Sequence, residues 1–215
     1  MTPWPALAAD SGVPVSESPG GLEELMVLFA ESGGVRAEFT ENRHLSILTE
    51  PIETSGVLYF SPPAYLARYT VQPDKSSVVT NGKQVALRDS IGTRTVDLDS
   101  SDLARELVSS FAVLLRGDFA ALTALYDAEF YLKEGHGSPL TSAWTLDLKP
   151  RSVEIRDLIQ RTRVKGLENR LTSMETLEKN GDRTLMLFSA VETGVEFDDE
   201  ELKALFSLND HDRGQ

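Results

Sequence analysis

The chain has 215 residues, 40% of them hydrophobic, which is enough for one large core in a single domain. Its 34 acidic residues against 21 Lys and Arg give a formal net charge of −13, which argues against a partner that is nucleic acid or an anionic membrane surface. Cysteine is absent, which excludes disulfides, thiolate metal sites and cysteine nucleophiles.

The N-terminal twenty residues predict a leader remnant and a flexible segment. Ala6-Leu7-Ala8, followed by Ala9-Asp10, has the small-x-small pattern that ends a cleaved secretory leader, although a basic n-region and a long apolar stretch are missing. The alternative is a plain apolar N-terminus. Residues 9–21 are rich in Ser, Pro and Gly and predict a flexible chain. The leader-like pattern favours the periplasm as the compartment.

A short amphipathic helix and a long strand are predicted next. Apolar residues recur at helical spacing over residues 22–29, and the pair Gly33-Gly34 predicts the end of this helix. The spacing then changes to two, with Val35, Ala37 and Phe39 on one face. This alternation predicts a strand with one buried and one solvent-exposed face.

Five shorter strands are predicted in the rest of the first half. They are extended runs bounded by Pro, Gly, Asp or Asn, at residues 55–60, 65–71, 77–80, 84–88 and 94–98. Asn81-Gly82 lies between two of them and predicts a hairpin with a type I′ turn, in which both central residues need φ > 0.

The middle of the chain predicts a broken helix or helical hairpin. Helical spacing runs from Leu103 to Leu115, with N-cap oxygens at residues 100–102 and a stop at Gly117, and a second helical piece covers residues 119–125.

Strands resume in the second half of the chain. They are predicted at residues 128–133, 142–148, 161–165, 171–178 and 183–191. The stretch from Pro150 is predicted to open as a helix, Asn180-Gly181 marks a second hairpin, and residues 198–208 are helical or partly extended. Residues 209–215 are predicted to be a disordered tail. The fold class is mainly β (α+β), a strongly curved antiparallel sheet of about nine to eleven strands around helices.

The order of these motifs is similar to that of the periplasmic outer-membrane lipoprotein carriers, the LolA family. The resemblance covers about residues 22–88 well, and a strand ending at Pro150 and the Asn180-Gly181 hairpin match more loosely. The residues that carry it are Val35-Arg36-Ala37-Glu38-Phe39-Thr40-Glu41, Ser55-Gly56-Val57-Leu58-Tyr59-Phe60-Ser61-Pro62-Pro63, Ala67-Arg68-Tyr69 and Val78-Val79-Thr80-Asn81-Gly82-Lys83. The family's arginine before proline, which helps to latch the lid, aligns with Pro62, so that latch is not carried over.

The resemblance implies an unclosed half-barrel over residues 21–208 with lid helices on its apolar face. Such a domain holds acyl chains of a lipoprotein or another lipid in an apolar cavity and passes them toward the outer membrane, without cofactor or metal. Its expected partners are this cargo, an inner-membrane donor and an outer-membrane acceptor, and it is expected to act as a monomer. Because each buried CH₂ contributes about 0.8 kcal/mol, such a ligand requires no sequence motif.

The family pattern also implies which side chains face the cavity. Ordinary core packing is the alternative role of the apolar ones, and a half-buried surface position is the alternative for the tyrosine. The expected lining residues are Ala37, Phe39, Leu58, Phe60, Tyr69, Leu107, Phe111 and Leu114. Arg68 is expected to contact a lipid headgroup or a lid carboxylate in place of the missing latch, against a plain structural charge.

Other functions find little support in the sequence. No Gly-x-Ser-x-Gly elbow, Walker A loop, dinucleotide fingerprint or His-Glu-x-x-His motif occurs, so no enzyme is predicted. The carboxylates at residues 97, 99 and 102 fit helix capping better than a calcium loop. The three histidines lack metal-ligand spacing: His44, His136 and His211. The alternative function is a sensor or interaction module of the same fold that binds an envelope protein.

Overall fold

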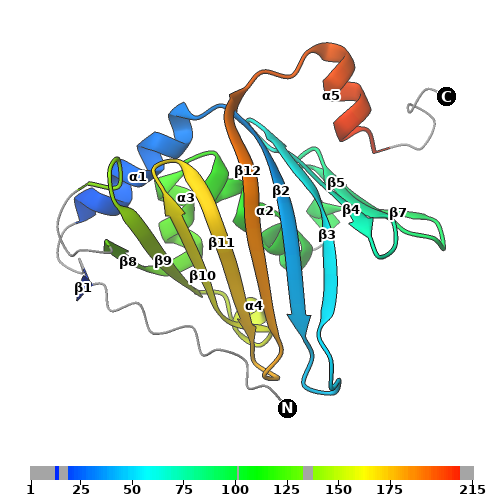
Figure 1. The fold of residues 1–215 in the computed structure, drawn as a ribbon, viewed down its shortest axis with the longest axis horizontal. Helices are drawn as coiled ribbons and strands as arrows, with labels where there is room; N and C mark the ends of the chain where they lie inside the picture. The colour runs from blue at the N-terminus through cyan, green and yellow to red at the C-terminus, as the bar shows by residue number, and fades with distance from the viewer. Residues whose placement is uncertain (1–12, 15–18, 101, 133–137, 209–215) are drawn as a thin grey trace.

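The computed structural model describes residues 13–14, 19–100, 102–132 and 138–208 (Figure 1). Within 102–110 it describes the side chains of Arg105 and Val108 only.

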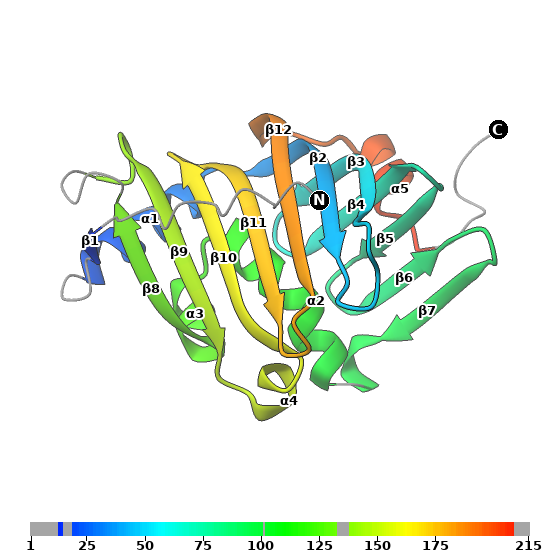
Figure 2. The same cartoon turned by 60° about the horizontal axis from the view of Figure 1, so that its bottom comes forward.

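One antiparallel sheet dominates the molecule. Its strands are β1 (Val13–Pro14), β2 (Gly34–His44), β3 (Ile52–Ser61), β4 (Tyr65–Gln72), β5 (Ser76–Thr80), β6 (Gln84–Arg88), β7 (Thr93–Asp97), β8 (Tyr126–Leu132), β9 (Ala143–Pro150), β10 (Ile159–Leu167), β11 (Arg170–Glu178) and β12 (Arg183–Val195). The order across the sheet is β1-β8-β9-β10-β11-β12-β2-β3-β4-β5-β6-β7. Two meanders, β2–β7 and β8–β12, therefore meet where β12 pairs with β2, and the sheet curves without closing (Figure 2). The predicted half-barrel is confirmed, since eleven strands run from β2 to β12.

Helices cover both faces of the sheet, most of them on the concave face. They are α1 (Pro19–Glu31), η1 (Leu98–Ser100), α2 (Asp102–Leu115), α3 (Phe119–Leu125), α4 (Val153–Arg156) and α5 (Asp199–Phe206). Figure 1 shows α1, α2 and α3 together on one side of the sheet, with α4 at one end. The connection from β7 to β8 thus crosses the concave face and fills it.

The core lies between these three helices and the concave face. β2 alternates buried and exposed residues as its sequence predicts, with Val35 and Phe39 turned toward the helices. Trp144 of β9 is 2% exposed, meets Phe29 of α1 edge-on at 6.0 Å between ring centroids, and donates its Nε1–H to the carbonyl of Glu168 at 2.9 Å. Burying the indole body with its polar tip satisfied stabilises this end of the core.

The turn between α2 and α3 is fixed by a glycine. Gly117 has φ +68°, and a Cβ there would lie 2.0 Å from the carbonyl oxygen of Met26 in α1. Only glycine allows the turn to approach α1 so closely. The predicted helix stop at Gly117 is confirmed.

The hairpin predicted at Asn81-Gly82 is present, but its turn is not type I′. Gly82 has φ +85°, whereas Asn81 does not have a positive φ. The Asn81 side chain instead accepts the backbone N–H of Lys83 at 3.0 Å and of Gln84 at 2.9 Å. A side-chain cap, rather than a second left-handed residue, therefore closes this turn.

The predicted flexible N-terminal segment is wrong in part. Val13 and Pro14 pair with Leu132 and Tyr131 of β8, and α1 begins at Pro19. Pairing with a free sheet edge thus gives these two residues an extended conformation that their composition does not predict. The leader-like Ala6-Leu7-Ala8 and the tail 209–215 lie outside the described residues.

Candidate functional site

A cavity of about 210 Å³ lies on the concave face between α2 and the second meander. Its lining residues are Phe111, Leu114, Tyr126, Leu148, Pro150, Ile159, Thr162, Val164, Met174 and Thr176. None of them is charged. The arrangement suits an apolar ligand held by burial rather than by directed polar contacts.

The cavity is small while α2 stays closed over it. An apolar cavity of about 150 Å³ holds a molecule the size of benzene. A cavity of about 210 Å³ is only slightly larger. At this volume it accommodates only part of a long acyl chain.

α2 contacts the sheet through aromatic stacking at this point. The ring of Phe111 stacks on that of Phe188 in β12, with 6.3 Å between centroids and 14° between planes. Phe188 lies directly opposite Phe39 of β2. Stacking of this kind adds about 0.5–1.5 kcal/mol to the stabilisation from buried area.

The predicted lining residues divide into three groups. Phe111 and Leu114 line the cavity. Phe39, Leu58 and Phe60 are buried in the same hydrophobic cluster but lie on the β2–β3 side of the concave face, and Ala37 is buried beside them. Leu107 lies in α2, and its side chain is outside the described residues.

The prediction that Tyr69 faces the cavity is wrong. Tyr69 pairs with Val57 of β3, so it points to the convex face, where its ring contacts Tyr59 edge-on at 6.1 Å. Its hydroxyl donates to the carbonyl of Leu205 in α5. Tyr69 therefore helps to fix α5 to the outside of the sheet, in a second cluster around Phe206.

Arg68 lies on the concave face, as its predicted role requires. It pairs with Leu58 in the β3–β4 register, and its Nη2 lies 2.9 Å from Oε1 of Glu41. The two side chains are 26% and 15% exposed. The ion pair is thus half-buried at the margin of the apolar face.

Most of the cavity lining was missed by sequence reasoning. Leu148, Val164 and Met174 come from β9, β10 and β11, whereas the resemblance was densest over residues 22–88. The apolar alternation of Trp144, Leu146 and Leu148 marks the inner face of β9, and it could have predicted that β9 contributes to the cavity lining. The sequence does not predict which strands leave a gap under α2, because this depends on how the elements pack.

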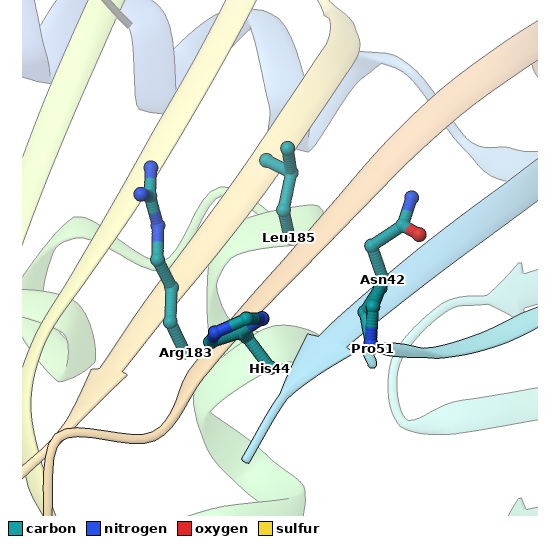
Figure 3. Close-up of a pocket in the computed structure, with 5 residues that line it drawn as sticks. All are labelled: Asn42, His44, Pro51, Arg183 and Leu185. Carbon is teal, nitrogen blue, oxygen red and sulfur yellow. The ribbon is translucent and has the colours of Figure 1, made fainter. Parts of the chain in front are cut away.

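A second hollow, of about 170 Å³, lies on the convex face (Figure 3). It is lined by Leu185 and Arg183 of β12, Asn42 and His44 of β2, and Pro51. Leu185 pairs with Asn42, and Arg183 pairs with His44. Met186, the residue after Leu185, points to the concave face, so Leu185 and its partner point to the convex face. The two hollows therefore lie on opposite faces of one sheet.

The convex face of the second meander carries ion pairs. Asp147 accepts both Nε–H and Nη2–H of Arg163 at 2.6 Å. Tyr131 donates to Glu129, and this hydrogen bond is the main cause that raises the pKa of Tyr131 to about 12. Lys149 and Tyr131 together lower the pKa of Glu129. These groups are paired with one another, so we assign them to the stability of the sheet.

The described residues contain neither a metal-ligating cluster nor a membrane-spanning helix. Over the described ranges, no three His, Asp or Glu side chains are grouped to hold a metal ion. None of the helices in the described part of the chain has the length and hydropathy to span a membrane. Asp97 accepts the N–H of Asp99 at 2.9 Å, so its carboxylate serves the turn before α2.

Comparison with known proteins gives consistent results. A family model described as outer membrane lipoprotein carrier protein LolA-like matches residues 20–207. An outer-membrane lipoprotein carrier protein of Pseudomonas putida is 25% identical over 185 residues, which cover 85% of this chain and 82% of that protein.

Among solved structures, MucB supports the fold. A crystal structure of MucB has a TM-score of 0.50 at 13% identity, covering 87% of this chain and 64% of MucB. A LolA superfamily protein from Nitrosomonas europaea has a TM-score of 0.44 at 9% identity, covering 87% and 97%. At these identities the likeness concerns the fold alone.

Proposed function

The chain belongs to the LolA-like outer membrane lipoprotein carrier family, and we propose that it carries acylated cargo in the cavity under α2. The cargo is a lipoprotein or another lipid, which a donor at the inner membrane delivers and an acceptor at the outer membrane receives. Transfer takes place in the periplasm, by a monomer, without catalysis or cofactor. The observation that carries the proposal is the uncharged cavity between a helix and the concave face of the sheet.

The energetics support a passive carrier. Each acyl CH₂ buried contributes about 0.8 kcal/mol, so a chain of about sixteen carbons gains roughly ten or more kcal/mol in an opened cavity. Opening it costs the stack between Phe111 and Phe188 and also the burial of Val113, Leu114 and Leu115, which are 2% exposed or less. Burial of the acyl chain offsets this cost.

Filling the cavity tests this proposal. Met174→Trp adds a ring to the lining, and we expect purified protein to carry at least about fivefold less bound lipid, because the acyl chain and the indole compete for one space. The measurement is native mass spectrometry of protein from an envelope fraction, before and after organic extraction. Leu187→Trp is the control, since Leu187 is 46% exposed on the convex face. Wild-type protein whose mass is unchanged by extraction, and which takes up no added lipid, would overturn the proposal.

The convex hollow favours a second candidate, an interaction module that binds an envelope protein. MucB, which shares the fold, has been crystallised in complex with MucA. A cavity of about 170 Å³ matches one large apolar side chain of a partner. A stoichiometric protein retained from envelope extracts by wild type and lost with Leu185→Glu, but kept with Leu187→Glu, would support this function over lipid transport.

A further inference from the structure

A polar cluster interrupts the concave face beside the cavity. It consists of Glu41 in β2, Thr54 in β3 and Arg68 in β4. The Arg68 Nη2 donates to Oε1 of Glu41 at 2.9 Å and to Oγ1 of Thr54 at 3.3 Å, and Thr54 donates to the same oxygen of Glu41 at 3.3 Å. The guanidinium carbon lies 4.6 Å from the centroid of the Phe39 ring. Three strands and an aromatic ring thus hold this guanidinium in place.

The guanidinium has donors that this cluster does not use. Both of its hydrogen bonds come from Nη2, and the buried Nε–H has no acceptor in the described part of the chain. Arg163 on the convex face differs, because its Nε and Nη2 both donate to Asp147. A buried donor without an acceptor costs about 1–3 kcal/mol, so the unused Nε–H of Arg68 calls for a partner that this chain does not supply.

A continuous strip of the concave face joins the cavity to Arg68. Met174, which lines the cavity, pairs with Met186, and Met186 pairs with Glu41. Two strand spacings, about 10 Å, separate Met174 from Glu41 along this row. The parallel row leads from Phe111 through Phe188 to Phe39, beneath the guanidinium. A chain end in the cavity and a polar group at Arg68 therefore lie within the span of one acyl chain.

The charge balance of the cluster indicates the chemistry of that polar group. Glu41 already compensates the charge of Arg68, so what remains is hydrogen-bond donor capacity rather than net positive charge. A second anion would lie close to the Glu41 carboxylate and lose its hydration there. An uncharged acceptor oxygen avoids both costs.

We propose that Arg68 is a specificity-determining residue that donates to the ester or amide carbonyl of a bound acyl chain. The inference rests on the proposed carrier function and names the atom that the carrier recognises. Acyl lipids would then be distinguished from alkyl lipids of equal length.

A pair of lipids that differ only in this carbonyl tests the inference. Delipidated protein is offered an equimolar mixture of 1,2-dipalmitoylglycerol and 1,2-di-O-hexadecylglycerol, and native mass spectrometry gives the ratio bound. We expect wild type to favour the ester at least about fivefold, although the ether is the more apolar lipid. Arg68→Met should abolish this preference while total uptake persists. Arg36→Met, an exposed arginine in β2, is the matched control and should keep it.

A second variant covers the case in which Arg68→Met leaves Glu41 unpaired and fails to fold. The double variant Arg68→Met with Glu41→Gln removes both charges and should give the same loss of preference. Equal binding of ester and ether by wild type would overturn the inference and leave the carrier function standing. Displacement of dipalmitoylglycerol by 1,2-di-O-hexadecylglycerol 3-phosphate, which has the charge but no ester carbonyl, would also overturn it, since the site would then recognise charge. Uptake of no lipid at all would overturn the carrier function itself.

Discussion

At the scale of single residues, adjacent positions in one strand have opposite roles. The sequence predicts Tyr69 in the cavity lining and Arg68 at a lipid headgroup or a lid carboxylate, yet successive side chains of a strand point to opposite faces. Pairing with β3 places Arg68 beside Leu58 on the concave face and Tyr69 beside Val57 on the convex face. Arg68 thus remains a candidate for ligand contact, whereas Tyr69 anchors α5.

Another single residue, Asp182, joins two turns at one end of the sheet. It is 8% exposed, and its Oδ1 accepts the backbone N–H of Ser46 at 2.7 Å, while its Oδ2 accepts Nδ2–H of Asn180 at 2.9 Å. The bond from Ser46 is the main cause that lowers the pKa of the Asp182 carboxyl. The β2–β3 turn is therefore held against the β11–β12 turn by a carboxylate.

This contact predicts a pH-dependent contribution to stability. Because the folded-state pKa of Asp182 lies below the unfolded value of about 3.9, its stabilisation is fully present above that value and is lost as the pH falls through the folded-state pKa. We expect wild type to exceed Asp182→Asn in free energy of unfolding by a constant amount between about pH 5 and 7, in the range where both states are ionised. The difference should shrink below about pH 4. Asp74→Asn, an exposed residue after β4, should show no such difference in urea titrations. A gap between wild type and Asp182→Asn that does not change down to about pH 2 would contradict the assignment.

At the scale of elements, α1 and α2 have different neighbours on the concave face. α1 is wedged between the α2–α3 turn and β9, with Met26 and Phe29 almost fully buried. The last turn of α2 is also buried, at Val113, Leu114 and Leu115, but this helix borders the cavity through Phe111 and Leu114. We expect α1 to stay fixed while α2 moves, because a gap on one side of a helix removes the contacts that hold it.

The close contact at Gly117 predicts a large effect of one methyl group. Gly117→Ala should lower the free energy of unfolding by about 2–5 kcal/mol, since it combines a left-handed backbone with a clash against Met26 and Ala30. Gly181→Ala is the control: its φ is +89°, but a Cβ at this position would meet nothing within 4 Å. It should cost only about 1–2 kcal/mol. Equal losses in urea unfolding would show that strain alone, without the contact to α1, determines the effect.

At the scale of the whole molecule, one sheet separates two surfaces of different character. The concave face encloses an uncharged cavity, and the convex face carries α5, ion pairs and the hollow at Leu185. Cargo bound inside and a protein bound outside would contact opposite sides of the same strands. A change of curvature in β12 or β2 would alter both faces, because their side chains alternate between them.

Opening of α2 as a lid is testable by cross-linking, because the native chain has no cysteine. Phe111→Cys with Phe188→Cys, joined by a short bismaleimide, should fix α2 to β12 and slow exchange of bound lipid at least about tenfold, since the lid can no longer leave the sheet. The single-cysteine variants treated with the same reagent are the controls. Exchange measured with a fluorescent fatty acid that is as fast in the cross-linked protein as in these controls would show that cargo enters by another route.

Local architecture and family could be predicted from the amino-acid sequence alone. Some features depend only on neighbours in the chain and can be predicted without a structure. They are the period-two alternation in β2, the helical spacing in α2 and the turn residues at Asn81-Gly82 and Asn180-Gly181. Three other features became known only from the folded chain. They are the position of the cavity, the choice between Arg68 and Tyr69 as the residue that faces inward, and the start of α1 at Pro19. These features depend on strand register and on unfilled volume beneath a helix, and both arise only when segments distant in the sequence pack together.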